Sequence, residues 1–388
     1  MNLRSYKTVK ERREALEKEA GVLFPNIGNF TLDESTASTR NCENMIGAAQ
    51  VPMGVAGPLT IHHSSFGIQN YYIPLATTEG ALVASVSRGC KAITESGGAV
   101  VDSHRVGATR GPVFRVNNLK QHDQIYRYLM TNLDELKRVA EATSDHLKLK
   151  KLLTRGVGHY RYVRFVFDTA DAMGMNMATI ATQALVTFIE KKFDVSCISV
   201  AGNFDIDKKP SWLNAIENRG MKAWAEVTIP SSVLKTVLKT TARSVYEVWL
   251  AKCMIGSALS GSLGFNAQYA NIIAATFAAT GQDLGHVAEG AVGITVAEIV
   301  NEEDLYMSVT LPDLMVGTVG GGTGLGTQKE ALTLLGVAGG NDGKNAQKFA
   351  EIIAGAVLAG EISLLASLSE GSLATAHERL GRGREIKK

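Results

Sequence analysis

The strongest constraint on the fold lies between residues 112 and 201, where strand and helix patterns follow one another in a definite order. PVFRVN has the pattern of a strand, residues 119–142 that of a long helix, and LKLKKLLTR that of a second strand. A glycine turn at 156–158 leads into the alternating strand HYRYVRFVFD, a helix at 175–193 and a last strand, DVSCISVAG. This β-α-β-β-α-β order predicts a ferredoxin-like unit.

The chain on either side of this unit predicts the domain organisation. A length of 388 residues leaves room for two or three domains. We expect an α+β protein in which a ferredoxin-like small domain, residues 112–201, is inserted into a large helix-rich domain. That large domain would comprise residues 41–111 and 202–388, preceded by an N-terminal helical segment, residues 1–40.

Glycine placement and helical periodicity predict the local structure of the large domain. The chain has 39 glycines but only 8 prolines, which favours tight turns over linkers. ENMIGAAQVPMGVAGPL, residues 43–59, is apolar and rich in Gly and Pro, and predicts a buried irregular segment. A helix capped by Thr77 or Thr78 would have Glu79 in its first turn and end at Gly97. Further helices are expected at 233–251, 271–281 and 345–381, with a glycine loop at 317–328.

Composition excludes several classes of function. A net charge of +2 and 6% aromatic residues argue against nucleic acid as a partner. The four cysteines are widely spaced and the eight histidines form no ligand motif, so we expect no metal site and a reducing compartment. The longest apolar run, 352–360, is too short to span a bilayer. A cytoplasmic protein without a membrane partner is therefore expected.

Two glycine-containing segments are candidates for anion or nucleotide binding. DAMGMNM, residues 171–177, joins a strand to a helix, whose first N–H groups can bind phosphate. The alternative is an ordinary turn in which Asp171 caps the helix. GTVGGGTGLG, residues 317–326, could approach a nucleotide closely, although it matches neither the Rossmann nor the P-loop pattern. Its alternative is a loop required only for packing.

Four charged positions are candidates for catalysis. Lys208, in DKKP, could hold an acidic substrate and stabilise an oxyanion; the alternative is a solvated turn. Glu79 stands among apolar residues, where a raised pKa would suit a general acid; the alternative is a partner of the helix dipole. Asp283 and His377 have ordinary alternatives too, as a loop cap and a surface histidine.

Five segments together make the chain resemble a known family. ENMIGAAQVPMGVAGPL, TTEGALVASVSRGCKAI, DAMGMNM, GNFDIDKKP and GTVGGGTGLGTQ occur in this order. In that order they resemble 3-hydroxy-3-methylglutaryl-CoA (HMG-CoA) reductase, in the class I form of eukaryotes and archaea. The resemblance runs from about Glu43 to His377. It implies reduction of HMG-CoA by NADPH to mevalonate and CoA through two hydride transfers, with NADH not excluded.

The resemblance also implies roles for the candidate residues. Lys208 would stabilise the oxyanion and Glu79 would donate a proton to the aldehyde stage. Asp283 would lie between them and couple their titrations, and His377 would protonate the departing CoA thiolate. The family further implies a homodimer or a dimer of dimers, with active sites at the subunit interface and the cofactor on the ferredoxin-like insert.

Contacts to substrate and cofactor follow from the same motifs. The substrate residues implied are Arg88, Arg110, Asn203, Asp207, Lys209, Lys252 and Asn271. The cofactor residues implied are Asp171, Met173, Gly174, Met175, Asn176, Gly320, Gly321, Gly322 and Thr323. One departure is Ala201, where the family often has a serine that contacts the acyl group. Two alternatives stay open: the same reaction in reverse as NAD-dependent mevalonate degradation, and a CoA-thioester hydrolase without redox chemistry.

Overall fold

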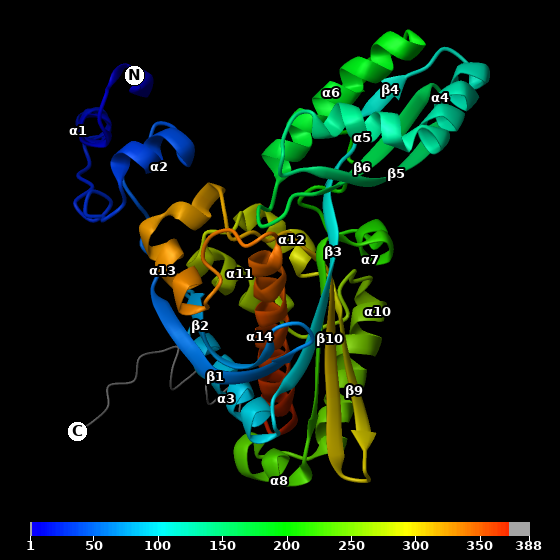
Figure 1. Cartoon of the computed structure of the whole chain (residues 1–388). Helices are drawn as coiled ribbons and strands as arrows, with labels where there is room; N and C mark the ends of the chain where they lie inside the picture. The colour runs from blue at the N-terminus through cyan, green and yellow to red at the C-terminus, as the bar shows by residue number, and fades with distance from the viewer. Residues whose placement is uncertain (1, 372–388) are drawn as a thin grey trace.

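The computed structural model describes residues 2–371, and its helices and strands form a mixed α+β protein, as predicted. Figure 1 shows a large body around the central helix α14 (Lys344–Ser369), a smaller unit of helices and strands at one end, and the N-terminal helices beside the body. The N-terminal elements are η1 (Leu3–Ser5), α1 (Val9–Ala20) and α2 (Glu34–Arg40). Thr8 and Glu11 form a capping box that starts α1.

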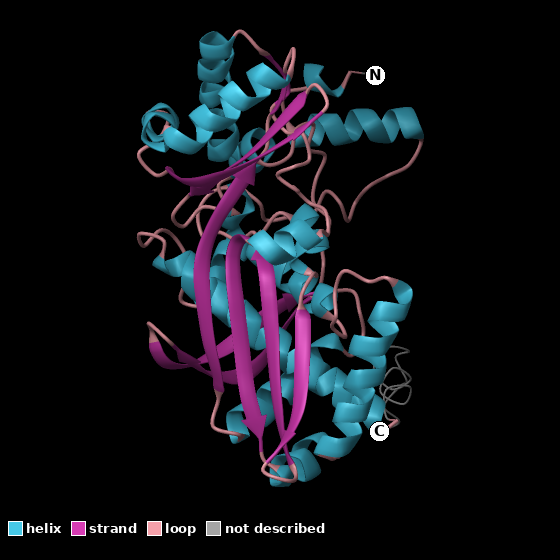
Figure 2. Ribbon diagram, turned by 90° about the vertical axis from the view of Figure 1, so that its right-hand side faces the viewer, coloured by secondary structure: helices cyan, strands magenta, loops and turns pink. Residues whose placement is uncertain are grey.

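The large body is built on a long, mostly antiparallel sheet (Figure 2). Strand β3 pairs with β8, β8 with β10, and β10 with β9, all antiparallel, while β1 pairs with β2 and, in parallel, with β3. The strands are β1 (Met53–His63), β2 (Gly67–Ala76), β3 (Ala99–Arg110), β8 (Arg219–Ile229), β9 (Ile294–Val300) and β10 (Asp304–Leu314).

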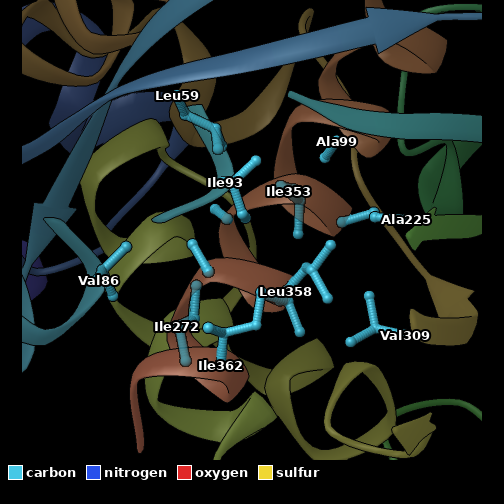
Figure 3. Packing of buried hydrophobic residues seen from close by; sticks show 14 of the residues in the cluster. Leu59, Val86, Ile93, Ala99, Ala225, Ile272, Val309, Ile353, Leu358 and Ile362 are labelled. Atoms are coloured by element: carbon cyan, nitrogen blue, oxygen red, sulfur yellow. The ribbon is translucent and has the colours of Figure 1, made fainter. Parts of the chain in front are cut away.

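Helix α14 is the centre of the hydrophobic core (Figure 3). Its side chains, among them Ile353, Leu358 and Ile362, lie in one cluster with Val86 and Ile272, which come from α3 and α11. The helix has 26 residues and is apolar enough to cross a membrane, but 83% of its most apolar window is buried inside the protein. Burial of this extent is what a core helix requires, and the charge that interrupts its apolar run, Glu361, is buried as well.

The remaining helices of the large body cover this core. They are α3 (Leu82–Glu95), α7 (Trp212–Glu217), α8 (Ser231–Val233), α9 (Ala242–Trp249), α10 (Ser257–Ser260), α11 (Tyr269–Thr280), α12 (Val287–Gly290) and α13 (Gly326–Leu334), with π-helical turns η2 (Leu234–Leu238) and η3 (Leu250–Gly256) and short 3₁₀ turns η4 (Leu284–His286) and η5 (Gly321–Gly324). Helix α3 approaches α14 so closely that a Cβ at Gly89 would lie 1.8 Å from the carbonyl oxygen of Ala359. Only glycine fits there.

The small unit contains its elements in the order expected from the sequence. They are β4 (Val113–Arg115), α4 (Leu119–Thr131), α5 (Leu133–Glu141), β5 (Lys148–Val157), β6 (Tyr160–Asp168), α6 (Met175–Phe193) and β7 (Ser196–Ser199). The strands pair antiparallel in the order β7-β4-β6-β5, over a core of its own that includes Phe114, Phe165 and Leu185. Strand β3 also pairs with β6, so one strand runs from the large sheet into the small one.

Two of the expected helices are broken. The helix predicted at 119–142 divides at Asn132, whose side-chain amide donates to the carbonyl of Tyr128. The helix predicted at 233–251 divides because Lys239 adopts a left-handed conformation (φ 59°) and Thr241 then caps α9. Hydrophobic periodicity runs through both breaks, so it could not reveal them.

Two other local expectations were wrong, the first of them in part. Residues 43–52 are irregular, as expected, but strand β1 begins at Met53, and the segment is not buried throughout, since Val51, Met53 and Val55 are each nearly half exposed. Glu79 is not in the first turn of a helix, since Ala81 is left-handed (φ 73°) and α3 begins only at Leu82. Glu79 lies in an exposed bend instead.

Candidate active site

Both glycine-containing segments and the DKKP turn line one cavity of about 760 Å³. The segment 172–177, at the start of α6, comes from the small unit. The glycine loop 317–323 comes from the large body and contacts the small unit through a bridge between Ala172 and Val319. Lys208, Asp283 and Arg110 line the same cavity. Segments far apart in the sequence therefore meet where the two units join.

The backbone around this cavity is shaped by glycines. Gly174 is left-handed (φ 85°), and a Cβ there would lie 2.3 Å from the side chain of Thr169. Gly320 and Gly321 also have positive φ, but a Cβ at either would meet nothing within 4 Å, so this part of the loop borders open space. Helix α6 has no side-chain cap, which leaves its first N–H groups available to an anion. The arrangement suits a phosphate-bearing cofactor.

Asp171, implied as a cofactor contact, also holds another part of the chain in place. Its carboxylate is buried and accepts hydrogen bonds from the backbone N–H groups of Asn341, Gly343 and Ala346. These groups lie just before and within the first turn of α14, where a negative charge also suits the helix dipole. Asp171 therefore caps a helix, as the alternative interpretation of its segment predicted, but that helix is α14 and not α6.

Lys208 and Asp283 form an ion pair, with the ammonium Nζ 2.7 Å from Oδ2. The loop that carries Lys208 contains three non-glycine residues with positive φ: Asn203, Ile206 and Lys208 itself. For a β-branched residue such as Ile206 this conformation is strained, and strain of this kind concentrates at functional sites. Burial raises the pKa of Asp283, but hydrogen bonds from Lys208 and the Gly285 N–H outweigh it and hold that pKa below its ordinary value.

Arg110, Asp207 and Lys209 accompany this pair. The guanidinium of Arg110 lies 3.5 Å from Asp207 and 3.4 Å from Asp205, and donates to the hydroxyl of Thr179 on α6. Lys209 donates to the backbone carbonyl of Asp207. The cavity therefore presents cations held in place by buried or half-buried carboxylates, as recognition of an acidic substrate requires.

Glu79 and Asn271 form a second group. The amide of Asn271 donates to the Glu79 carboxylate at 3.3 Å. Helix α11, which carries Asn271, is held at its start by Glu361, whose carboxylate accepts from the N–H groups of Ala267 and Gln268. Burial raises the pKa of Glu361 despite these hydrogen bonds. Within the described residues of one chain, Asp283 is paired with Lys208 and makes no hydrogen bond or ion pair with Glu79.

Two other implied residues, Lys252 and Arg88, lie away from this cavity. Lys252 borders a separate hollow with Ser257 and Asn266. Arg88, on α3, donates a hydrogen bond to Ser363 of α14 and forms an ion pair with Glu370, which directly follows that helix. These positions do not line the cavity that contains Lys208 in the described part of one chain. His377 lies outside the described residues.

Several residues of this region were missed from the sequence. Asn41 and Leu325 line the cavity, and Arg219, His286 and Glu289 form a buried network below the Lys208 pair. The spacing of His286 and Glu289, three residues apart, is the only local signal for the network. An arginine at the first position of a strand gave no indication that Arg219 would be fully buried.

Comparisons with known proteins decide the family. The model of the hydroxymethylglutaryl-coenzyme A reductase family matches residues 8–382. The 3-hydroxy-3-methylglutaryl-coenzyme A reductase of Pyrococcus abyssi is 49% identical over 375 residues, which cover 96% of this chain and 92% of that protein. The chain belongs to the hydroxymethylglutaryl-CoA reductase family. It is therefore an oxidoreductase, of the archaeal class I type that the motifs indicated.

Other members extend this comparison. The reductase of Methanothermobacter thermautotrophicus is 48% identical over 376 residues, covering 97% of this chain and 94% of that protein. A solved structure of the class II reductase from Streptococcus pneumoniae, described as bound to NADPH in open conformations, has a TM-score of 0.68 at 20% identity. It covers 94% of this chain and 98% of that one. At that identity the likeness shows that the family fold is shared.

Proposed function

We propose that this chain reduces HMG-CoA to mevalonate and CoA with NADPH, and that the cavity around Lys208 is where the chemistry takes place. The observation that carries the proposal is the meeting of the Lys208–Asp283 pair with both glycine-containing segments in one cavity. The relatives at 48–49% identity are named as reductases of this substrate. Arg110 and Lys209, near the same pair, would hold the glutaryl carboxylate.

The residues around the glycine segments fit a dinucleotide. Met173, Gly174, Met175 and Asn176 present the open start of α6, and Gly320 to Thr323 border it from the large body. NADPH supplies the hydride when it is bound there. Residues 112–201 would act as an inserted ferredoxin-like cofactor domain. The cations that line the described part of the cavity are Arg110 and Lys208, and both are assigned to the substrate. No further cation there marks a site for the 2′-phosphate of NADPH, so NADH is kept as a second cofactor to be tested.

Each candidate residue has a defined task in this proposal. Lys208 stabilises the negative charge that develops on the thioester oxygen, and Asp283 orients its ammonium. Glu79 donates a proton at the aldehyde stage, with Asn271 holding its carboxylate. His377 protonates the thiolate of the departing CoA. Asn203, Asp207, Lys252 and Arg88 would position substrate, some of them through a neighbouring subunit.

We infer that a second copy of the chain covers the open parts of the site. Glu79 is exposed, and Val51, Met53 and Val55 form an exposed apolar edge on the segment leading into and along β1. An apolar edge of this kind is typical of subunit interfaces. We therefore infer a homodimer or a dimer of dimers in which another subunit completes the surroundings of Glu79. We further propose that the enzyme is soluble and works in the cytoplasm.

Substrate-dependent oxidation of the cofactor tests the proposal. Adding HMG-CoA to enzyme and NADPH should oxidise two NADPH for each CoA thiol released. Thiol release without cofactor oxidation would identify a hydrolase instead. Faster reduction of NAD by mevalonate and CoA than of NADP would favour the degradative direction, and parallel initial rates with NADH and NADPH would establish the preference.

A further inference from the structure

The buried network below the Lys208–Asp283 pair is centred on a histidine that the reaction described above does not use. His286 is fully buried at the end of η4, three residues after Asp283. Its Nδ1 is hydrogen-bonded to the carboxylate of Glu289. Its Nε2 has no hydrogen-bond partner among the described residues. An unpaired polar atom at a fully buried position calls for a physical explanation.

The surroundings of Nε2 supply that explanation. Two carboxylate oxygens lie near it: Oδ2 of Asp283 at 3.8 Å and Oδ1 of Asp207 at 4.0 Å. Because Glu289 accepts a hydrogen bond, Nδ1 carries a proton. If Nε2 carried none, its lone pair would face two negative charges. A proton on Nε2 removes this repulsion and makes His286 an imidazolium that points at Asp283.

The charges around the imidazole support the same assignment. Four carboxylates are linked by ion pairs around it, and three cations pair with them; the carboxylates are Asp205, Asp207, Asp283 and Glu289, and the cations are Arg110, Lys208 and Arg219. The imidazole itself lies within 4.0 Å of three of these carboxylates, Asp207, Asp283 and Glu289. Asp313 lies beyond Arg219, and burial together with the charge of Glu289 raises its pKa, which opposes a further negative charge there.

A bound metal is a poorer explanation. Ligand atoms of Asp207, His286 and Glu289 lie within 4.8 Å of one another, which is close enough to suggest a cation site. However, Arg219 already donates to both Asp207 and Glu289 and is itself fully buried. A divalent ion would have to enter beside that guanidinium, so the repulsion disfavours it.

We propose that His286 is a positioning residue: as an imidazolium held by Glu289, it keeps Asp283 ionised and oriented toward Lys208. The proposal rests on the roles of Lys208 and Asp283 in the proposed function. Its consequence is that the ion pair loses support when His286 loses its proton. The turnover rate should therefore fall in alkaline solution, where an imidazolium gives up its proton.

Two substitutions separate this role from a structural one. His286→Asn keeps an amide near the position of Nδ1, where it can still donate to Glu289, but leaves nothing near Nε2. His286→Gln places its amide near the position of Nε2, facing Asp283, without a titrating proton. We expect kcat to fall roughly 10-fold in His286→Asn, less than the loss of a direct oxyanion donor, and less than that in His286→Gln. The KM for NADPH should be unchanged in both.

The pH profile and a control complete the kinetic test. Both variants should lose the alkaline decrease in kcat that the wild type shows, whereas His104→Gln, at an exposed position, should keep the wild-type profile. If His286→Asn keeps wild-type kcat and profile while His286→Gln is damaged, the histidine serves only its contact with Glu289 and the proposal is wrong. If Lys208→Ala retains activity, the proposed function fails instead.

A direct measurement covers the case in which the variants do not fold. In the wild-type enzyme labelled with ¹⁵N-histidine, one buried histidine should have both ring nitrogens at imidazolium shifts at pH 7. In Asp283→Asn that residue should move toward the neutral form, because one of the two facing charges is gone. Neutral ring nitrogens from about pH 6 to pH 8 in the wild type would overturn the proposal.

Discussion

The surroundings of Lys208 and of Glu79 differ in how much one chain provides. Lys208 is paired with Asp283 and lies above a buried network of arginines, acids and His286. Glu79 lies in an exposed bend, and its side chain has one hydrogen bond among the described residues, from Asn271 at 3.3 Å. Lys208 is thus oriented in advance, whereas Glu79, the proposed proton donor, is open to solvent.

This difference indicates how Lys208 and Glu79 would each acquire the function proposed for them. An oxyanion stabiliser must be fixed before the reaction, since reorganisation during it would cost catalytic power. A carboxyl group donates a proton near neutral pH only when its surroundings raise its pKa. Glu79 is exposed in the described part of the chain, so we expect substrate or a second chain to cover it. The following predictions test that division.

The largest effect is expected from Lys208→Ala. Loss of the ammonium should lower kcat by about 10³-fold for both reduction steps, since each develops negative charge on oxygen. Binding of CoA should change little. The measurement is NADPH oxidation with HMG-CoA and, separately, with mevaldehyde.

Lys239→Ala is the matched control for Lys208→Ala. Lys239 is also an exposed lysine with positive φ, 59° against 57° for Lys208, so both substitutions place alanine in the same strained conformation. Wild-type activity is expected in Lys239→Ala. More than a tenth of wild-type activity in Lys208→Ala would contradict the assignment of the oxyanion stabiliser.

A smaller effect, on particular steps, is expected from Glu79→Gln and His377→Gln. Glu79→Gln should slow reduction of mevaldehyde by about 10²-fold, the scale of general-acid catalysis. His377→Gln should cripple reduction of HMG-CoA and spare much of the mevaldehyde reaction, which releases no thiolate. Equal losses of both reactions in the two variants would show that the proton donors are not divided in this way.

The sequence predicted the small unit and the motifs better than it predicted the site. The order of elements in residues 112–201 follows from local hydrophobic patterns, and helix α6 has the bounds expected. Glu79 was misplaced because the left-handed Ala81 delays the start of α3. No residue type marks that conformation, and alanine rarely adopts it.

The buried network shows a different kind of limit. Arg219, His286 and Glu289 are brought together by β8 and the segment η4–α12, and each appears unremarkable in its own segment. Contacts that depend on tertiary packing cannot be read from local periodicity. Asp171 illustrates the same point, since its partners lie about 170 residues later, at the start of α14.

Gly174→Val should affect cofactor binding more than substrate binding. A side chain there would meet Thr169, and valine disfavours the left-handed conformation that starts α6. We expect the KM for NADPH to rise about 10-fold, by roughly 1.4 kcal/mol of lost binding, while the KM for HMG-CoA changes little. Gly67→Val, at a left-handed residue that starts β2 and has open space around it, is the control for backbone strain alone. An equal rise in both KM values would contradict the cofactor assignment.

The smallest effect should be that of Asp283→Asn on the stability of the fold. This substitution tests whether the Lys208–Asp283 ion pair serves mainly to stabilise the folded protein. The side chains of Lys208 and Asp283 are 43% and 37% exposed, and ion pairs with that exposure contribute about 0.5 kcal/mol or less to the free energy of unfolding. Because the pKa of Asp283 is lowered in the folded protein, the stabilisation is present above the unfolded pKa, about 3.8, and is lost as the pH falls through the lower folded value.

Thermal unfolding at pH 7 and near pH 3 can measure this difference. Asp283→Asn should have a slightly lower unfolding temperature than the wild type at pH 7, and this difference should narrow in acid. The control is Asp123→Asn, which removes an exposed ion pair with Arg127 at the same distance of 2.7 Å and should behave in the same way. Only Asp283→Asn should also lose turnover. A loss of several kcal/mol at pH 7 would mean that the pair holds the fold together. In that case the orientation of Lys208 would be a consequence of folding and not evidence of a preorganised site. An ion pair that stabilises the whole chain would be present whether or not it took part in the reaction, so the contrast with the open Glu79 would say nothing about catalysis.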